Sequence, residues 1–501
     1  MGNGGTLQQA KTAEDTMLRE LAWLAPIGTL AVAAIVAVAL ATFLPRAHQR
    51  AVATWVTVAH LTCAALAAGV WLDRGFRSTM SATVQVDGPS LALTGVVGIG
   101  GAICCILAAP AVRGTDREGE FYAVLTFASL SCVVLASAAD AALIAIAIGA
   151  LGLATFILTG YLRGSKRANE ASIKYYIFGT VSGAIMAYGL SWWFGQAGTT
   201  SLREIGVALS SAPAGIVVAS TAMVLVGLFY KAAAVPFHFW TPDAYDGAPL
   251  AVAAYLSVLP KLAGLIALAR VLTLALPADL IGWSTVIAIV AAATMTLGNL
   301  AALRQDNAVR LLAYSSIAQS GYMLMAVAAL DRSEQALPAL IYYAIAYAAT
   351  NLAVFAVVIA VQREQGSVAI SAFAGLGRRH PRQATALGLG LLSLVGIPPL
   401  TGFVGKLELF TASIDADQTW LAVIAVVNTV ISLFYYLRLL TPAILESSEP
   451  TVGRDDTDRS GRRHGIRAVN RAATAAASAV LVFGLAAEPL LSLVDHATML
   501  R

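Results

Sequence analysis

Charged residues are scarce in this 501-residue chain: Asp, Glu, Lys and Arg make up 12% of it, whereas hydrophobic residues make up 58%. Soluble proteins contain about 25% charged residues, so this composition excludes a soluble globular fold. The net charge is only +4, and no basic patch is interleaved with aromatic residues, which excludes nucleic-acid recognition. The sequence therefore predicts an all-α membrane protein that crosses the bilayer many times.

Cysteine is also rare. Cys63, Cys104, Cys105 and Cys132 all lie in apolar runs, and no CxxC or Cys/His ligand spacing occurs. We therefore expect no disulfide, zinc or iron–sulfur site on this chain. Walker A, GxGxxG, nucleophile-elbow and haem-attachment motifs are missing as well, so any redox cofactor is expected on partner subunits.

Long apolar runs recur along the chain. A membrane-spanning helix needs about 20 apolar residues, and the runs predict fourteen helices: 23–44, 51–72, 90–112, 121–139, 141–163, 174–197, 213–236, 248–272, 280–302, 309–330, 336–361, 383–414, 417–442 and 468–494. The first 22 residues are polar and no small-residue cleavage site follows, so the N-terminus is expected to be retained. Ser447 to Gly465 is polar without apolar periodicity, which predicts a flexible cytoplasmic linker.

Lysine and arginine are concentrated in alternate connections. The connections that follow the first, third, fifth, ninth, eleventh and thirteenth spans hold twenty of these residues, and the opposite side, Arg270 included, holds eight. Basic residues gather on the cytoplasmic side of a membrane protein. Both termini are therefore predicted to face outward, and alanine-rich composition suggests a bacterial plasma membrane.

Two of the predicted spans are interrupted. The seventh runs into Pro236 and the stretch WTPDAYDGAP, and the twelfth carries GIPPLTG near its middle. Non-helical backbone at membrane depth is tolerated where it is buried in protein or lines a hydrated cavity. A packed proline kink is an equal alternative for Pro236, whereas GIPPLTG more strongly favours a functional break.

Three lysines lie inside predicted spans. Lys231 is near the middle of helix seven, Lys261 follows Pro260 in helix eight, and Lys406 follows the break in helix twelve. A lysine at the bilayer centre costs about 2.5–3.5 kcal/mol on insertion scales. One explanation for these lysines is that they form ion pairs that stabilise helix packing. The other is that they form a chain of protonatable sites. Lysine suits proton relay because, unlike arginine, it can lose its proton.

Few other titratable groups lie near these lysines. Glu408 is inside a span but two residues from Lys406, so it should point to another flank of the helix. Asp140 is expected to be a turn or cap residue. His238 and Asp243 follow the first break, and His238 titrates near neutrality or serves as a fixed hydrogen-bond donor.

At these residues the chain resembles a known family. Residues 227–272, GLFYKAAAVPFHFWTPDAYDGAPLAVAAYLSVLPKLAGLIALARVL, resemble subunit N of the bacterial proton-pumping NADH-quinone oxidoreductase, respiratory complex I. NEASIKYYIFG, RLLAYSSIAQSGYML, GIPPLTGFVGKLELF and YYLRLL resemble it in the same order. The likeness is good over about 160–440 and slight in the first three helices.

The resemblance implies fourteen helices with two inverted five-helix repeats, and a buried relay in which Lys231, Lys261 and Lys406 carry protons. It divides the chain into 1–112 (tail and helices 1–3), 113–272 and 273–442 (the repeats), and 443–501 (linker and helix 14). It also implies other membrane-arm subunits as partners, with NAD, FMN, iron–sulfur clusters and quinone bound by partner subunits.

Two residues depart from the family pattern. Gly149 stands where the family carries a glutamate in helix five, and Gln319 where it carries a histidine. A nearby opposite charge shifts a pKa by about 1–3 units, so loss of the acid partner of Lys231 puts pumping through the first half in question. We hypothesise that Glu408 compensates.

Three functions remain open on the sequence. The leading one is proton translocation coupled to quinone reduction elsewhere in a complex. The others are a cation/proton antiporter subunit of the multi-subunit sodium type, and a degenerate structural paralogue that keeps assembly contacts without pumping.

Overall fold

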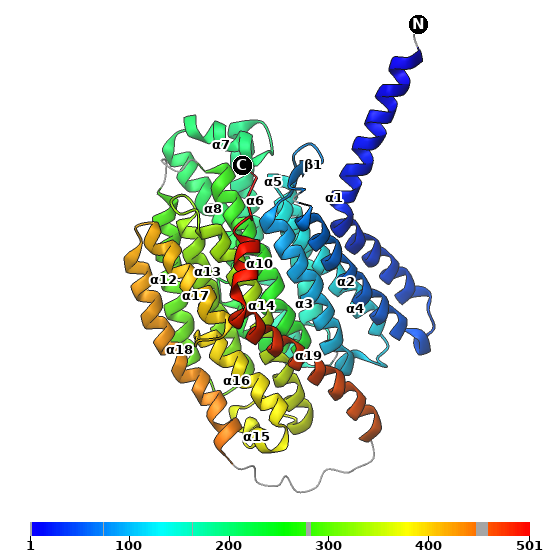
Figure 1. The fold of residues 1–501 in the computed structure, drawn as a ribbon, viewed down its shortest axis with the longest axis vertical. Coiled ribbons are helices and arrows are strands. Elements are labelled where there is room, and N and C mark those ends of the chain that lie inside the picture. Colours follow the sequence, from blue (N-terminus) through cyan, green and yellow to red (C-terminus); the bar gives the residue numbers. More distant parts are fainter. Residues whose placement is uncertain (1–2, 74, 163, 277–281, 447–458, 501) are drawn as a thin grey trace.

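The computed structural model describes residues 3–73, 75–162, 164–276, 282–446 and 459–500. These form a bundle of helices with one small hairpin (Figure 1). The elements are α1 (Asn3–Phe43), η1 (Arg46–His48), α2 (Arg50–Leu72), β1 (Arg77–Thr79), β2 (Val84–Val86), α3 (Gly88–Val112), α4 (Glu118–Ser137), α5 (Ala141–Thr159), α6 (Lys166–Ala197), α7 (Leu202–Ser211), α8 (Ala214–Ala232), α9 (Trp240–Gly247), α10 (Leu250–Ala275), α12 (Trp283–Ala302), α13 (Ala308–Ala329), α14 (Ala336–Gln365), η2 (Ile370–Phe373), α15 (Leu376–Arg379), α16 (Pro381–Val395), α17 (Thr401–Asp415), α18 (Thr419–Leu445), α19 (Arg459–Leu485) and α20 (Ala487–Val494).

Among the described residues, twelve helices are long and apolar enough to cross a membrane. The expected spans 174–197 and 383–414 are not among them. The first corresponds to α6, which is long but less apolar, and the second is divided into α16 and α17 of 15 residues each. The all-α membrane fold and both expected breaks are therefore confirmed, while the total of fourteen spans stays a prediction.

The chain ends and connections differ from their expected bounds in three places. Helix α1 begins at Asn3 and not at residue 23, so the polar N-terminal residues, which include helix-forming Gln, Ala, Lys and Glu, are helical. The last expected span, 468–494, is two helices, α19 and α20. Of the expected linker Ser447 to Gly465, residues 447–458 lie outside the described residues, and the remainder is the start of α19.

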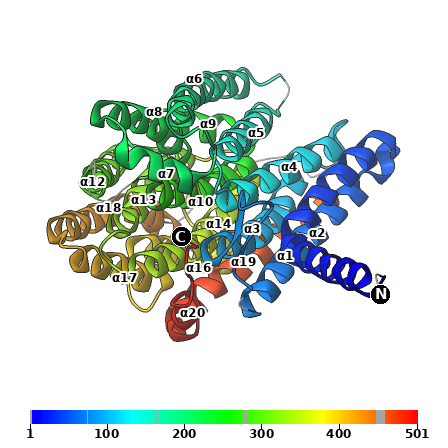
Figure 2. The ribbon, with the colours of Figure 1, turned by 90° about the horizontal axis from the view of Figure 1, so that it is seen from above.

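Helices α10, α13 and α14 form the centre of the bundle (Figure 2). Their sequences are apolar all round, and 89–94% of their most apolar windows is buried. A helix that is hydrophobic on every side belongs in the interior. Because α10 packs against α8, α13 and α14, and α13 also packs against α17, the centre connects the two broken helices.

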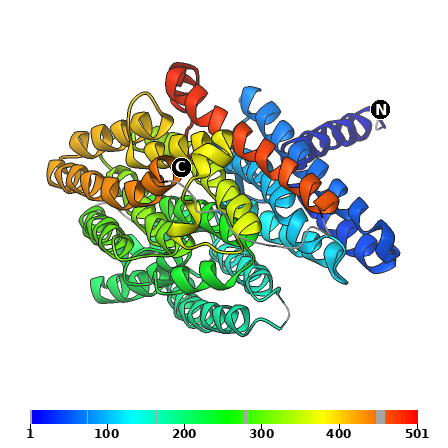
Figure 3. The same cartoon turned by 90° about the horizontal axis from the view of Figure 1, so that it is seen from below.

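Helix α19 crosses the bundle obliquely (Figures 1 and 3). It packs against α3, α14, α16 and α17, helices that are far apart in sequence. In Figure 1 the start of α1 and the segment that follows α20 both lie towards the end of the bundle where α7 lies. The side of the membrane that this end faces stays a prediction.

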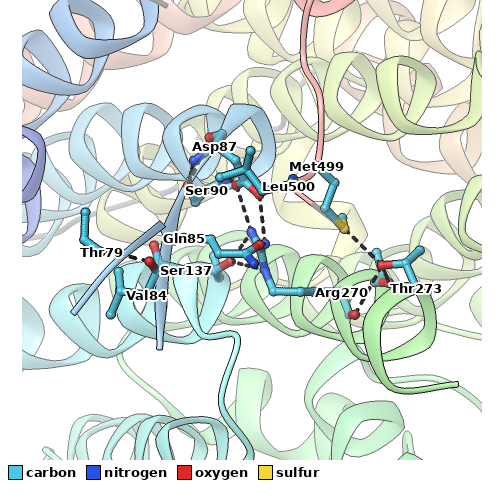
Figure 4. Close-up of polar contacts among 12 residues, drawn as sticks. Thr79, Val84, Gln85, Asp87, Ser90, Ser137, Arg270, Thr273, Met499 and Leu500 are labelled. Atoms are coloured by element: carbon cyan, nitrogen blue, oxygen red, sulfur yellow. Dashed lines mark hydrogen bonds and ion pairs between the residues drawn. The ribbon is translucent and has the colours of Figure 1, made fainter. Parts of the chain in front are cut away.

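A buried ion pair lies at that end of the bundle (Figure 4). Arg270, expected in an outer connection, is completely buried in α10, where its two terminal nitrogens each lie 2.8 Å from an oxygen of Asp87. Asp87 is also the N-cap of α3, and its carboxylate accepts a hydrogen bond from Leu500 N at 3.3 Å. One carboxylate therefore joins α3, α10 and the C-terminal segment.

Removal of this carboxylate should be strongly destabilising. Breaking a buried ion pair by removing one partner costs about 3–5 kcal/mol because the other charge stays buried and uncompensated. We expect Asp87→Ala to lower the melting temperature of the protein in mild detergent, as measured by intrinsic fluorescence. Glu204→Ala, an exposed carboxylate in α7, is the control, and equal melting of the two variants would contradict the prediction.

Candidate functional site

The first break lies directly after Lys231. Lys231 is the penultimate residue of α8 rather than near the middle of a helix, as the sequence analysis expected, because the helix ends at Ala232 and Ala233 has a left-handed backbone. Seven residues then lead to α9. The freed backbone is satisfied locally: Val235 N donates to Thr294 Oγ1 at 3.0 Å, and the Trp240 indole donates to the Tyr230 carbonyl at 3.0 Å.

The ammonium group of Lys231 is buried and unpaired. The side chain is 1% exposed, and within the described part of the chain its Nζ has neither a hydrogen-bond partner nor a carboxylate partner. It points towards α5, where a Cβ on Gly152 would lie 3.9 Å from Nζ. Gly149, where the resemblance implies a glutamate, is one turn earlier and exposed. Helix α5 therefore places no counter-charge beside Lys231.

Lys261 occupies the centre of the bundle. It is completely buried in α10, and its Nζ donates to Ser316 Oγ of α13 at 2.6 Å. The ring of Tyr245 from α9 lies 5.5 Å from the same nitrogen. The middle lysine therefore contacts a hydroxyl and an aromatic face, neither of which is a permanent anion.

Lys406 bonds the backbone at the second break. Helix α16 ends at Val395, and the Val395 carbonyl, which has lost its helical partner, accepts a hydrogen bond from Lys406 Nζ at 2.9 Å. Thr429 Oγ1 of α18 lies 3.3 Å from Nζ, and the Tyr322 ring centre 4.2 Å. The lysine after the break thus replaces the missing backbone donor.

Helix α13 places polar side chains between Lys261 and Lys406. Ser315 Oγ is 2.5 Å from the Tyr436 hydroxyl, and Gln319 donates to that hydroxyl at 3.3 Å. The Gln319 carbonyl accepts a hydrogen bond from Tyr343. Tyr322 lies one turn further on and contacts Thr429 at 3.2 Å. Gln319 therefore joins two tyrosines in this network but carries no titratable proton.

The remaining predicted residues differ in their relation to the lysines. Glu408 is partly exposed and makes no hydrogen bond or ion pair with Lys406 or any other described residue. His238 is buried in the first break, within electrostatic reach of Lys261. Asp140 caps α5, accepting from Leu143 N at 2.9 Å and from Thr200 at 2.5 Å, as predicted.

Helix α9 carries two acids that anchor the first break. Asp243 pairs with Lys174 of α6 and Arg310 of α13, each at 2.9 Å, and Asp246 pairs with Arg167 and with Asn307. Partial burial opposes the charge of Asp243, but the hydrogen bonds from Lys174 and Arg310 outweigh it and lower its pKa. The two ion pairs of Asp243 are therefore present at neutral pH and are lost only as the pH falls through that lowered pKa.

A cavity of about 1100 Å³ opens beside Asp246. It is lined by Arg113, Arg167, Asn307 and Arg363, together with the start of α10. This is the end of the bundle predicted to face the cytoplasm, and the lining of the cavity is both polar and apolar. The sequence analysis did not identify Asp246, although it follows Asp243 by three residues and so lies near it on α9.

Comparisons with known proteins agree on a family. Residues 138–432, which contain all three lysines, match the family described as NADH:quinone oxidoreductase/Mrp antiporter, TM. The chain is 39% identical over 442 residues to NADH-quinone oxidoreductase subunit N 1 of Streptomyces griseus, covering 88% of this chain and 92% of that protein. It is 39% identical to subunit N of Mycobacterium sp. (strain JLS), covering 76% and 79% respectively.

The chain belongs to the subunit N family of NADH-quinone oxidoreductases. Its fold matches a chain of respiratory complex I from Thermus thermophilus with a TM-score of 0.78 and 29% identity, covering 94% of this chain and 100% of that one. A chain of the Mrp complex from Dietzia sp. DQ12-45-1b has the same fold, with a TM-score of 0.83 at 24% identity and coverage of 95% and 96%. In this subunit N family member, Lys231, Lys261 and Lys406 are all buried.

Gly396 is required at the second break. Its φ is +92°, a backbone conformation that L side chains rarely adopt, and a Cβ there would lie 3.0 Å from Lys406 Cδ. We expect Gly396→Ala to cost about 1–3 kcal/mol and to displace Lys406, which would lower thermal stability. Gly183→Ala, a helical position with open space around it, is the matched control. An unchanged melting temperature for Gly396→Ala would refute the role assigned to Gly396.

Proposed function

We propose that this chain is a proton-translocating membrane-arm subunit of an NADH-quinone oxidoreductase. One observation carries the proposal: three lysines are buried on α8, α10 and α17, and none has a carboxylate partner among the described residues. A structural ion pair would need such a partner. The alternative, which the geometry favours, is a lysine that loses and regains its proton.

The three lysines differ in the groups to which they are bonded. Lys231 has no bonded partner, Lys261 is bonded to Ser316, and Lys406 is bonded to a carbonyl and to Thr429. Hydroxyl groups can donate and accept, so they pass a proton without keeping a charge. The polar residues of α13 supply such groups between Lys261 and Lys406. The cavity beside Asp246 supplies access from the cytoplasmic side.

In this proposal, the free energy for proton movement comes from reactions outside this chain. NADH oxidation and quinone reduction, with NAD, FMN and iron–sulfur clusters, take place on partner subunits, and this chain carries no redox step. A change of charge at the interface with a neighbouring membrane subunit shifts the proton affinity of the nearest lysine. Repulsion between protonated lysines then passes the change along the series.

Replacement of the central lysine tests the function. A positioned proton-transfer group contributes about 10²–10⁴-fold to its step, so Lys261→Ala should abolish proton movement through this chain. The measurement is the number of protons taken up per NADH oxidised by the intact complex in liposomes. Lys261→Arg should fail as well, because arginine keeps its charge.

Controls and contrary outcomes separate the alternatives. Lys166→Ala, an exposed lysine at the start of α6, should leave the ratio of protons to NADH unchanged. An unchanged ratio for Lys261→Ala would indicate a structural paralogue. Sodium-dependent transport by a purified assembly without NADH-dependent quinone reduction would indicate a cation/proton antiporter subunit.

A further inference from the structure

The cavity beside Asp246 lies where several spans end. Its lining comes from the ends of α3 and α14, the starts of α6, α10 and α13, and the connection between α5 and α6. Of these helices, α3, α5, α10, α13 and α14 are long and apolar enough to cross a membrane. They meet at the end of the bundle where α15 lies (Figure 1). Because lipid headgroups lie beyond the ends of the apolar spans, this cavity is at headgroup level.

The charges that line the cavity favour an anion. Among the described residues of the lining, Arg113, Arg167 and Arg363 are basic and Asp246 is acidic. The carboxylate of Asp246 already has partners, since Arg167 lies 2.5 Å and the Asn307 amide 2.9 Å from its oxygens. The formal charge of the lining is therefore positive, and its acid is occupied by groups of the protein itself.

Arg113 and Arg363 belong to two helices that pack against each other. Arg113 is the C-cap of α3; it is exposed and makes no hydrogen bond or ion pair with a described residue. Arg363 lies in the last turn of α14 and donates to the carbonyl of Pro110, three residues before Arg113. This bond holds the Arg363 guanidinium beside the end of α3. Guanidinium groups suit phosphate because they donate two parallel hydrogen bonds to its oxygens.

The wall of the cavity is held by hydrogen bonds between two connections. Asn307 and Ala369 form an antiparallel bridge, and Ala308 N donates to the Val368 carbonyl at 2.9 Å. The Asn307 side chain also caps α13 by accepting from Val309 N at 2.8 Å. Because these contacts form within the protein alone, a ligand need not order this wall, which lowers the cost of binding.

The deeper part of the cavity is apolar. Leu107 and Ile359 line it from positions more than one turn before the ends of α3 and α14. An inorganic phosphate ion would leave this apolar wall in contact with water, which is unfavourable. The volume of about 1100 Å³ also exceeds the roughly 300–1,000 Å³ of pockets for drug-sized molecules. A ligand that carries both a phosphate and hydrocarbon matches the two parts of the lining.

We propose that this cavity binds the phosphate headgroup of an acidic phospholipid. Arg113 and Arg363 contact the phosphate, and Leu107 and Ile359 contact the glycerol and acyl carbons. Basic pockets between membrane-spanning helices on the cytoplasmic side bind headgroups of this kind. The site is separate from the three lysines. A headgroup fills only part of the cavity, so water still reaches Asp246 and the route for protons stays open.

Photolabelling of the intact complex in mild detergent tests the site. The probe is a phosphatidylglycerol with a photoreactive diazirine on the acyl chain near the glycerol, and mass spectrometry locates the labelled peptides. We expect label on the peptides that contain Leu107 and Ile359, and several-fold less from a phosphatidylcholine probe of the same design, because choline cancels the phosphate charge. Equal labelling by the two probes would overturn the proposal. Loss of label on adding inorganic phosphate alone would also overturn it, by indicating a site for the free ion.

Arginine variants test the residues assigned to the phosphate. A basic residue near an anionic lipid contributes about fivefold to binding, so Arg113→Gln and Arg363→Gln should each lower labelling about fivefold at a subsaturating concentration of the probe. Arg378→Gln, an exposed arginine of α15 at the same end but outside the described lining, is the matched control and should leave labelling unchanged.

Arg113→Gln keeps the test valid if Arg363→Gln fails to assemble, because Arg113 has no bond to another described residue to lose. Unchanged labelling in Arg113→Gln, or an equal loss in Arg378→Gln, would sink the inference. Labelling is measured without NADH, so its outcome is independent of whether Lys261→Ala changes the ratio of protons to NADH.

Discussion

A helix broken inside a bilayer leaves backbone groups that lipid cannot bond, and the way this chain satisfies them determines where its lysines sit. At the second break, the donor that replaces the lost amide is the ammonium of Lys406 itself. A charged donor bonds a carbonyl about twice as strongly as a neutral one. The backbone at this break is therefore held more tightly when Lys406 is protonated than when it is neutral, which links the charge of the lysine to the geometry of the helix.

The first break is built differently. Its backbone is satisfied by Thr294 and by the indole of Trp240, so Lys231 is not needed as a donor. The acids of α9 hold the far side of this break to α6 and α13 through ion pairs. Lys231 is consequently free to change its protonation without loosening the fold. The two lysines at breaks thus differ: Lys406 bonds the backbone at its break, whereas Lys231 does not.

The sequence predicted much of this architecture, and the failures have identifiable physical causes. Apolar runs located the helices. The insertion cost of lysine singled out Lys231, Lys261 and Lys406, because whether a residue lies in a membrane span can be judged from its neighbours in the sequence. The partners of those lysines could not be predicted, since Ser316, Thr429 and Tyr322 come close only when separate helices pack. Arg270 was wrongly assigned to a connection because its partner Asp87, which allows the arginine to be buried, precedes it by 183 residues in the sequence.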